Sequence, residues 1–345
     1  MKILLIGNFA PPYEEENLHN ISLLYRLEKD GHKCTVINIS EEPSGDKKFI
    51  EAKSFPAFMA RVVRHSFNKD VVHFLTKGYL RVGLLKLMMS IFFGRLFRAK
   101  TIVTFHSELF SILGQMRSPF GGTQTLLTSF LIADKIIFTD KDTYEVAAVY
   151  RRKPNFELVP SFVHVPEEVM NNESLSLTRL KSKEKVIIFS NVKYPSFIFD
   201  TVMDLVTAYH LPSDIGIVIS LSEKPSAKYQ HVIADSGRAV TESLIFVESN
   251  NIQAMLMAFS KADIIIRPLS CDGTTYFESF ALSVKKLIRS EANIYFSGGL
   301  VLVKEGKISK MCVNIFNSML SSKAVAVPEL EAGDPYTRIM DFYKK

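Results

Sequence analysis

The sequence predicts an α/β protein with two parallel β-sheets, each covered by helices. Short apolar runs typical of buried strands alternate along the chain with segments that have the apolar spacing of helices. A polar stretch at residues 166–185, without a sustained apolar period, separates two such halves. The chain has 345 residues, of which 47% are hydrophobic and 23% charged, so it is long enough for two domains with full cores.

The first half opens with a β-α-β unit. Strands are expected at residues 2–6 and 34–39, and between them a helix at residues 14–29, where apolar residues recur at helical spacing. Gly31 ends that helix. Three carboxylates at its start, Glu14, Glu15 and Glu16, complement the helix dipole but would repel a phosphate. We therefore expect a phosphate to bind in the second half of the chain.

Four further strands complete the first sheet, at residues 71–74, 100–105, 133–139 and 156–159. His73, in the first of these, either lines a cleft or is a buried structural histidine.

A long apolar helix is expected at residues 80–97, with Arg81, Lys86, Arg95 and Arg98 in or next to it. At 100° per residue these four cations do not form one basic face. Two interpretations stay open. The helix packs on the sheet with its cationic side chains extending to solvent, or it lies in a membrane interface.

His106 directly follows the strand at residues 100–105. Ligands of open parallel sheets bind at the carboxyl ends of the strands, and an imidazole can hydrogen-bond a hydroxyl group. We therefore predict that His106 contacts a ligand. The alternative is a histidine that only fixes the following loop.

The second half repeats the strand and helix alternation. Strands are expected at residues 186–190, 215–221, 244–247 and 262–267, with helices near 196–209, 227–236 and 252–259. Beyond them we expect strands at 286–290 and 300–303, a helix at 308–321 and a terminal helix at 334–344.

The clearest ligand signal follows the strand at residues 262–267, where Pro268 takes the chain out of the sheet. The residues at the first turn of the next helix are Asp272, Gly273, Thr274 and Thr275. Free backbone N–H groups and the helix dipole favour an anion there. Glu278 lies on the helix side away from the apolar stripe. The pattern predicts a phosphate-sized site with a carboxylate on either side; the alternative is a plain helix cap.

This stretch resembles one in the retaining glycosyltransferases of family 4, which have the GT-B architecture. In a subgroup of that family a strand ending in Arg-Pro is followed by Asp-Gly and then by a Glu in the next helix, as in Arg267-Pro268, Asp272-Gly273 and Glu278. The runs D-V-V-H at residues 70–73 and A-D-K-I-I-F-T at residues 133–139 are similar to strand signatures of the same family.

The resemblance implies two Rossmann-like domains facing a cleft. Residues 1–165 would form the acceptor-side domain and residues 186–327 the nucleotide-sugar donor domain, with a linker at 166–185 between them. Residues 328–345 would carry a C-terminal helix that crosses back to the first domain. The implied activity is hexosyl transfer from a UDP- or GDP-sugar to a glycan or lipid-linked acceptor, with retention of configuration, in surface polysaccharide biosynthesis.

The resemblance also implies the roles of individual residues. His106 and Asp272 are the expected catalytic residues, close to the donor sugar. Lys193 and Arg267 would offset the charge of the donor pyrophosphate, and Glu278 would bind the ribose. The backbone amides of Gly273, Thr274 and Thr275 would receive a phosphate. No cofactor or metal ion is expected, because the sugar donor is a substrate and metal-ligand patterns are not present in the sequence.

The net charge of +6 suits an anionic donor or an anionic membrane face better than nucleic acid, because the basic residues are scattered without an aromatic-basic motif. The three cysteines, Cys34, Cys271 and Cys312, are widely spaced and suit a reducing cytoplasm. No apolar run reaches the roughly 18 residues of a membrane helix. We expect a cytoplasmic protein, with peripheral contact to an anionic membrane as a further expectation.

Two rival functions stay open. The chain has one cation, Lys193, where the family usually has an Arg and a Lys, and only five residues between Asp272 and Glu278. These departures favour a transferase-like scaffold or binding subunit without turnover. A nucleotide-sugar 2-epimerase shares the architecture, but the helix-borne carboxylates and histidines expected of its first domain do not form a recognisable motif.

Overall fold

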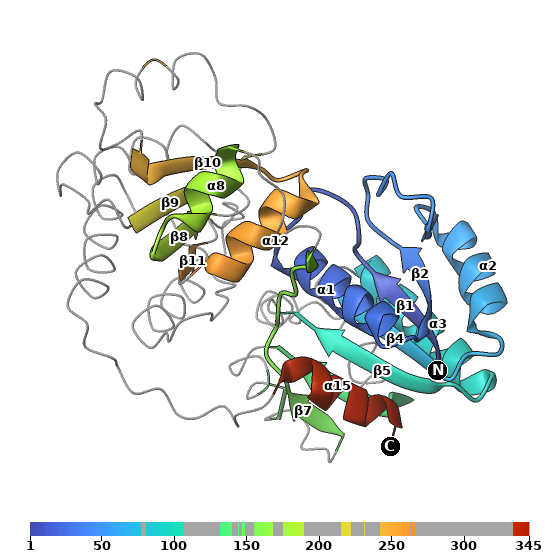
Figure 1. Cartoon of the computed structure of the whole chain (residues 1–345). Coiled ribbons are helices and arrows are strands. Elements are labelled where there is room, and N and C mark those ends of the chain that lie inside the picture. The colour runs from blue at the N-terminus through green and yellow to red at the C-terminus, as the bar shows by residue number, and fades with distance from the viewer. Residues whose placement is uncertain are drawn as a thin grey trace. The chain divides into compact units, whose positions relative to one another are not determined.

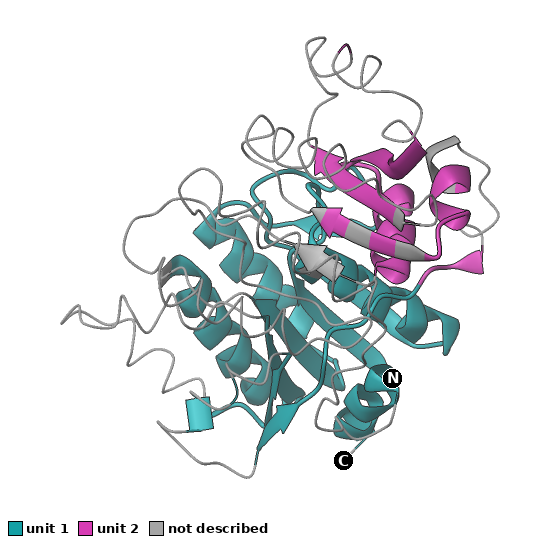
Figure 2. Cartoon of the chain, turned by 90° about the vertical axis from the view of Figure 1, so that its left-hand side faces the viewer, with its two compact units in different colours: residues 1–164, 331–345 teal, residues 165–330 magenta. Residues whose placement is uncertain are grey.

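The structure of the chain is a computed structural model. It describes residues 1–76, 81–106, 132–139, 144, 147–148, 155–167, 175–189, 215–221, 231, 242–262, 264–266 and 334–344. The chain divides into two units, coloured separately in Figure 2. Unit 1 comprises Met1–His164 together with Glu331–Lys345, and unit 2 comprises Val165–Leu330.

Unit 1 contains a seven-stranded sheet in which neighbouring strands run parallel, in the order β3-β2-β1-β4-β5-β6-β7 (Figure 1). Its strands are β1 (Lys2–Gly7), β2 (Lys33–Asn38), β3 (Phe49–Glu51), β4 (Val71–Thr76), β5 (Lys100–Phe105), β6 (Lys135–Phe138) and β7 (Phe156–Leu158). After β3 the chain crosses to the other side of β1 and continues outwards from β4. The strand order therefore reverses between β1 and β4, which is the position where open α/β sheets bind ligands.

Helices cover both faces of this sheet (Figure 1). α2 (Phe55–Ser66) and α3 (Arg81–Leu96) pack on one face, in a core that includes Leu4, Ile6, Phe58, Val72, Phe74, Leu84, Leu87, Ile91, Val103 and Phe105. α1 (Glu15–Lys29) and α15 (Pro335–Lys344) lie on the other face. Side chains alternate along each strand, so Phe74 points towards α3 and its neighbour His73 towards α15.

The C-terminal helix α15 belongs to unit 1, which confirms the expectation that it crosses back to the first domain. Its buried side chains are Tyr336, Ile339, Met340, Phe342 and Tyr343. The hydroxyl of Tyr343 lies 2.6 Å from Nδ1 of His73, and the hydroxyl of Tyr336 donates to Asp30 at 2.5 Å. Arg26 of α1 forms an ion pair with Asp334 at 2.8 Å, just before α15. Apolar and polar contacts together hold this helix against the sheet.

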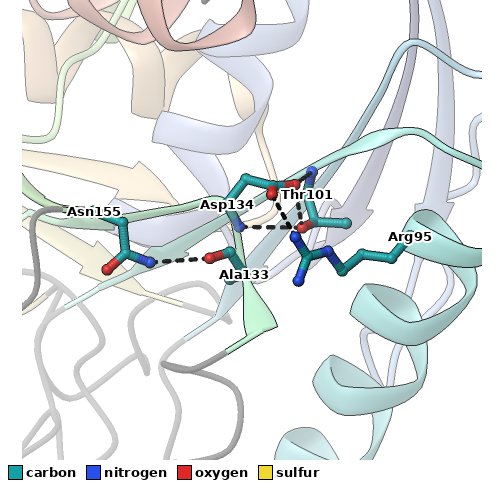
Figure 3. A network of polar contacts seen from close by, with 5 residues as sticks. All are labelled: Arg95, Thr101, Ala133, Asp134 and Asn155. Carbon is teal, nitrogen blue, oxygen red and sulfur yellow. Dashed lines mark hydrogen bonds and ion pairs between the residues drawn. The ribbon is translucent and has the colours of Figure 1, made fainter.

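A polar network joins the amino ends of β5 and β6 to the end of α3 (Figure 3). Oδ2 of Asp134 accepts hydrogen bonds from both the backbone N–H and the hydroxyl of Thr101, each at 2.8 Å. Oδ1 of Asp134 pairs with Arg95 at 3.0 Å. Close by, the side-chain amide of Asn155 donates to the carbonyl of Ala133 at 2.9 Å. The aspartate of the A-D-K-I-I-F-T run therefore fixes the start of β6 against β5.

Unit 2 contains a four-stranded parallel sheet in the order β10-β9-β8-β11. Its strands are β8 (Lys185–Phe189), β9 (Ile215–Leu221), β10 (Leu244–Glu248) and β11 (Ile264–Ile266), and its helices are α8 (Leu175–Lys181) and α12 (Ile252–Lys261). α12 begins where the Asn251 side chain accepts a hydrogen bond from the N–H of Ala254 at 3.1 Å, and six consecutive residues, 254–259, are buried.

The segment that we expected to be a linker, residues 166–185, contains α8 and reaches the start of β8. α8 contacts α12 and β10, and Leu180 is buried, so apolar residues in this polar stretch are used for packing within unit 2. Its polar composition concealed a short helix that packs against α12 and β10.

Within the described residues the predicted strands lie within about two residues of their observed positions, whereas β3 and α2 were not predicted. The expected elements at residues 196–209, 286–290, 300–303 and 308–321 lie outside the described residues, and so does the helix expected near 227–236 except for residue 231. In the part of the chain that the structure describes, no helix combines the length and the hydropathy needed to cross a bilayer.

Candidate functional site

The carboxyl edge of the unit 1 sheet faces a run of buried polar side chains on α1. Five residues in the first half of this helix are at most 7% exposed: Glu16, Asn17, His19, Asn20 and Ser22. A helix normally turns such residues to solvent, because a buried polar group is costly unless it is hydrogen-bonded. The first two turns of α1 are therefore built for polar contacts at the sheet edge.

Gly7, the last residue of β1, allows α1 to approach β4 closely. A Cβ atom at this position would lie 3.1 Å from Nδ2 of Asn20 and also 3.1 Å from both Cβ and the carbonyl oxygen of Leu75. Nδ2 of Asn20 donates to the carbonyl of Asn8 at 2.9 Å. The amide of Asn20 is thereby fixed at the point where the strand order reverses.

Glu16 is a buried carboxylate beside the same loop. Its two carboxylate oxygens each lie 3.2 Å from Nδ2 of Asn8, and only 2% of the residue is exposed. Of the three carboxylates that we expected at the start of α1, this one points inwards rather than to solvent. It places a carboxyl group next to the end of β1.

His19 is neutral and its proton can be assigned. Its Nδ1 accepts a hydrogen bond from the backbone N–H of Phe162 at 3.2 Å, so in the neutral ring the proton is on Nε2. Burial lowers the pKa of His19 to about 3 because the charged form would lose its hydration. His19 therefore presents an N–H donor at neutral pH.

His106 lies where the sequence predicted, directly after β5 at the carboxyl edge. Its backbone N–H donates to the carbonyl of Thr76 at 2.9 Å, which continues the β4–β5 pairing by one residue, and the residue is 2% exposed. Its ring lies edge-on to the ring of His19, with centroids 4.9 Å apart at an angle of 70°. The structure thus brings the predicted histidine next to one that the sequence analysis did not select.

Three buried polar atoms around this point have no hydrogen-bond partner among the described residues. They are Nε2 of His19, Oδ1 of Asn20 and Oγ of Ser161. Ser161 directly precedes Phe162, whose backbone N–H donates to His19. Two residues further on, the backbone N–H of His164 donates to the Ser22 hydroxyl at 2.9 Å, so this segment runs alongside α1. Buried polar groups are nearly always paired in folded proteins, so unpaired groups indicate a ligand or water that completes them.

The donors and acceptors of this site suit a hydroxyl-rich, uncharged group. A neutral imidazole N–H, an amide oxygen and a serine hydroxyl can bind sugar hydroxyls by both donating and accepting. The Glu16 carboxylate close by would oppose a phosphate. The chemistry of this edge suits the neutral part of a ligand better than a charged part.

His73 is a structural histidine, which decides between the two interpretations of its position. Its Nδ1 lies 2.6 Å from the Tyr343 hydroxyl and its Nε2 lies 2.7 Å from the Thr104 hydroxyl. Burial and the nearby His19 lower the pKa of His73 to about 3, and burial raises the pKa of Tyr343 well above its usual value. The neutral imidazole links β4, β5 and α15.

The other predicted site residues lie outside the described residues. They are Lys193, Arg267, Asp272, Gly273, Thr274, Thr275 and Glu278. The strand that precedes most of them, β11, is present and pairs with β8. The pairing of His106 with Asp272 and the phosphate site of unit 2 therefore stay predictions.

The sequence analysis missed His19, Asn20 and Ser161. A signal for the first two exists: Asn20 lies on the same helix line as Leu24 and Leu27, at i+4 and i+7, and His19 is four residues before Leu23. Leu23, Leu24 and Leu27 are buried, so His19 and Asn20 lie on the buried side of the helix, where a polar residue is unusual. No comparable pattern surrounds Ser161.

The described residues contain no group of three or more His, Cys, Asp or Glu side chains that could hold a metal ion. The expectation that the activity needs no metal stays a prediction, because part of the chain lies outside the described residues.

No family model matches the chain, and no curated protein matches it by sequence. Solved structures do match it. A candidate UDP-N-acetylglucosamine 2-epimerase from Listeria monocytogenes has 13% sequence identity and a TM-score of 0.54, covering 99% of this chain and 94% of its own. The UDP-GlcNAc 2-epimerase of Methanocaldococcus jannaschii, solved with UDP-GlcNAc and UDP, has 12% identity, a TM-score of 0.52, and coverage of 100% and 99%.

The Anabaena protein HepE, solved with UDP and glucose, has 12% identity and a TM-score of 0.50, covering 93% of this chain and 90% of its own. The fold is of the GT-B type. At such low identities these similarities show the fold alone. The resemblance to family 4 within the GT-B proteins stays a prediction.

Proposed function

We propose that this GT-B protein is a glycosyltransferase that transfers a hexosyl group from a UDP- or GDP-sugar to a glycan or lipid-linked acceptor. The observation that carries the proposal is the group of unpaired buried polar atoms of His19, Asn20 and Ser161 beside His106. It lies at the reversal of strand order, where a fold of this class binds its ligand. Support also comes from two proteins of similar fold, one solved with UDP and glucose and the other with UDP-GlcNAc and UDP.

In this proposal the residues of unit 2 that the family resemblance selects bind the nucleotide-sugar donor, and unit 1 is the acceptor-side domain. The neutral groups at the unit 1 edge hydrogen-bond the sugar hydroxyls, with His106 closest to the transferred sugar. The backbone amides of residues 273–275, with Lys193 and Arg267, stabilise the charge that develops on the leaving diphosphate, and Glu278 binds the ribose. Retention of configuration, a cytoplasmic location and a role in surface polysaccharide assembly belong to the same proposal, on the strength of the family resemblance.

A 2-epimerase is the second candidate, and a specific observation favours it. α1 buries both a carboxylate, Glu16, and an imidazole, His19, in unit 1. A 2-epimerase is expected to carry carboxylates and histidines on helices of its first domain, and the sequence alone did not reveal such a pair. Two of the proteins of similar fold are also described as epimerases or candidate epimerases.

The test separates the two activities in one experiment. The purified chain is incubated with UDP-Glc, UDP-GlcNAc and GDP-mannose, and products are followed by NMR and by release of free nucleotide. Transfer or slow hydrolysis releases UDP or GDP, whereas epimerisation gives a nucleotide-linked sugar with inverted C2. Binding of none of the three donors, measured by calorimetry, would favour the scaffold alternative and contradict the proposal.

Variants then assign the site. His106→Gln and His19→Gln should each lower turnover by roughly tenfold to hundredfold, because each removes hydrogen bonds to the bound sugar. Lys29→Gln, an exposed position on the same helix as His19, is the matched control and should leave turnover unchanged. Asp272→Ala and Glu278→Ala test the unit 2 residues, and unchanged turnover in both would remove them from the site.

A further inference from the structure

The exposed apolar side chains of unit 1 are concentrated on one face. Among the described residues, six large hydrophobic side chains are exposed: Val63, Phe67, Val82, Leu85, Phe92 and Leu96. All six belong to α2, to α3 or to the residue that follows α2. Phe67 is 68% exposed and Leu96 is 59% exposed. We call this surface the α2–α3 face.

The spacing on α3 shows that this face points away from the sheet. Val82, Leu85, Phe92 and Leu96 follow one another by three, seven and four residues, which places them on one side of a helix. The opposite side, with Leu84, Leu87 and Ile91, is buried against the sheet. α3 is thus an ordinary packed helix whose outer side is apolar as well.

Aromatic contacts join the exposed parts of the two helices into one surface. The ring of Phe67 lies 5.8 Å from that of Phe97, and Phe97 lies 6.4 Å from Phe93. Phe93 is in turn 5.2 Å from Phe92. Single exposed apolar residues need no explanation, but a contiguous group of this kind marks an interaction surface.

The two helices that carry the α2–α3 face contain no carboxylates. Neither α2 nor α3 contains an Asp or Glu, whereas their sequences contain Arg61, Arg64, Arg81, Lys86 and Arg95. Arg64 is exposed on α2, directly after Val63 in the sequence, and Arg98 is exposed just after α3. Arg95 is paired with Asp134 at the border, and Lys86 is buried over the ring of Phe58, so these two do not supply free charge.

This charge pattern decides between two occupants. In a symmetric dimer the face would meet a copy of itself, which would bring Arg64 and Arg98 towards like charges with no carboxylate on either helix to neutralise them. The surface of an anionic bilayer offers the opposite charge and an apolar layer beneath it, as amphipathic helices in membrane interfaces require. The observations therefore favour a membrane over a second copy.

We propose that the α2–α3 face docks unit 1 on the surface of an anionic lipid bilayer, with Leu85, Phe92 and Leu96 entering the interface. Arg64 and Arg98 contact lipid headgroups beside them. The proposal goes beyond the transferase activity and does not depend on it. Donor binding and vesicle binding are measured in separate experiments, so either proposal can be contradicted without affecting the other.

The chain lacks tryptophan, which gives a direct experiment. Phe92→Trp introduces a single indole on the α2–α3 face, and Lys29→Trp introduces one on an exposed position of α1 as the matched control. Vesicles of phosphatidylcholine with about a third of anionic phosphatidylglycerol should shift the fluorescence emission of Phe92→Trp to the blue. The emission of Lys29→Trp should stay unchanged. No shift for Phe92→Trp would overturn the proposal.

Flotation with the same vesicles tests both contributions. Leu85→Ser with Phe92→Ser, and separately Arg64→Glu with Arg98→Glu, should each lower vesicle binding at least tenfold, whereas Lys29→Glu should not. Equal binding to pure phosphatidylcholine vesicles would overturn the role of charge. A dimer in solution that the Leu85→Ser and Phe92→Ser substitutions dissociate would show that a second copy occupies the face, and would also overturn the proposal.

Discussion

The two edges of the unit 1 sheet use polar side chains in opposite ways. At the amino edge, Asp70 accepts from the backbone N–H of Lys2 at 2.6 Å, and Asp134 binds Thr101 twice and Arg95 once. At the carboxyl edge, His19 and Asn20 are more deeply buried, yet each has a polar atom without a partner among the described residues. Asn155 at the amino edge departs from this contrast, since its amide oxygen also has no partner there.

The difference teaches how to separate residues that hold the fold from residues that act on a ligand. The carboxylates of the amino edge bind backbone N–H groups of neighbouring strands, so their interactions are complete in the protein alone. At the carboxyl edge, His19 and Asn20 are each positioned by one hydrogen bond and offer a second polar atom. Because an unpaired buried polar atom lowers stability, such groups are retained for binding. Three measurements test this contrast.

The largest expected effect comes from acid. His19 and His73 are neutral in the folded protein, with pKa values lowered to about 3, whereas in the unfolded chain a histidine titrates near 6.5. Below that pH the unfolded state takes up protons that the folded state does not, so stability falls with pH. Between pH 7 and pH 5 we expect a loss of about 2 kcal/mol per histidine in the free energy of unfolding.

Urea unfolding at the two pH values measures this loss. His19→Gln should remove roughly half of the difference between pH 7 and pH 5. A difference that is unaltered by His19→Gln would show that the buried imidazole at the carboxyl edge does not control the acid response.

The second effect concerns the amino edge. Asp134→Ala removes a carboxylate that binds Thr101 and Arg95, and should lower the free energy of unfolding by about 3 kcal/mol, since hydrogen bonds to charged groups are among the stronger ones. Nucleotide-sugar binding by the folded variant, measured by calorimetry, should stay within twofold. A loss of binding without a loss of stability would reverse the assignment of the two edges.

The smallest effect on stability is expected at Ser161, whose buried hydroxyl has no partner among the described residues. Ser161→Ala should change the free energy of unfolding by less than about 0.5 kcal/mol while weakening donor binding about tenfold. Ser22→Ala is the matched control, because that hydroxyl donates to Leu18 and accepts from His164. It should cost about 1–2 kcal/mol and leave binding unchanged.

Much of the fold could be predicted because apolar runs and helical spacing are local signals. The described strands of both sheets except β3, together with the C-terminal helix, followed from them. β3 and α2 were missed since β3 has three residues, and α2 begins with Phe55-Pro56 after a polar loop, with only Phe58 and Val62 as its buried apolar residues. Short edge strands and helices with few core residues give weak patterns.

The site was predicted only in part, for a different reason. His106 was found because its position after a buried strand is itself the signal. His19 was not, since its role depends on the chain after β7 returning to α1 and placing the N–H of Phe162 against its ring. Contacts between residues 143 positions apart leave no periodic trace in the sequence.

The hydrogen bond between His73 and Tyr343 has a consequence for biosynthesis. Unit 1 is interrupted in the sequence by all of unit 2, and α15 is its last element to be made. Domains usually fold as they leave the ribosome, from the N-terminus onwards. Unit 1 is therefore completed only after unit 2 has been translated, and until α15 is made the His73 imidazole lacks its contact with the Tyr343 hydroxyl. In the nascent chain, unit 1 stays incompletely folded while about 170 further residues are synthesised, at about 5–20 residues per second.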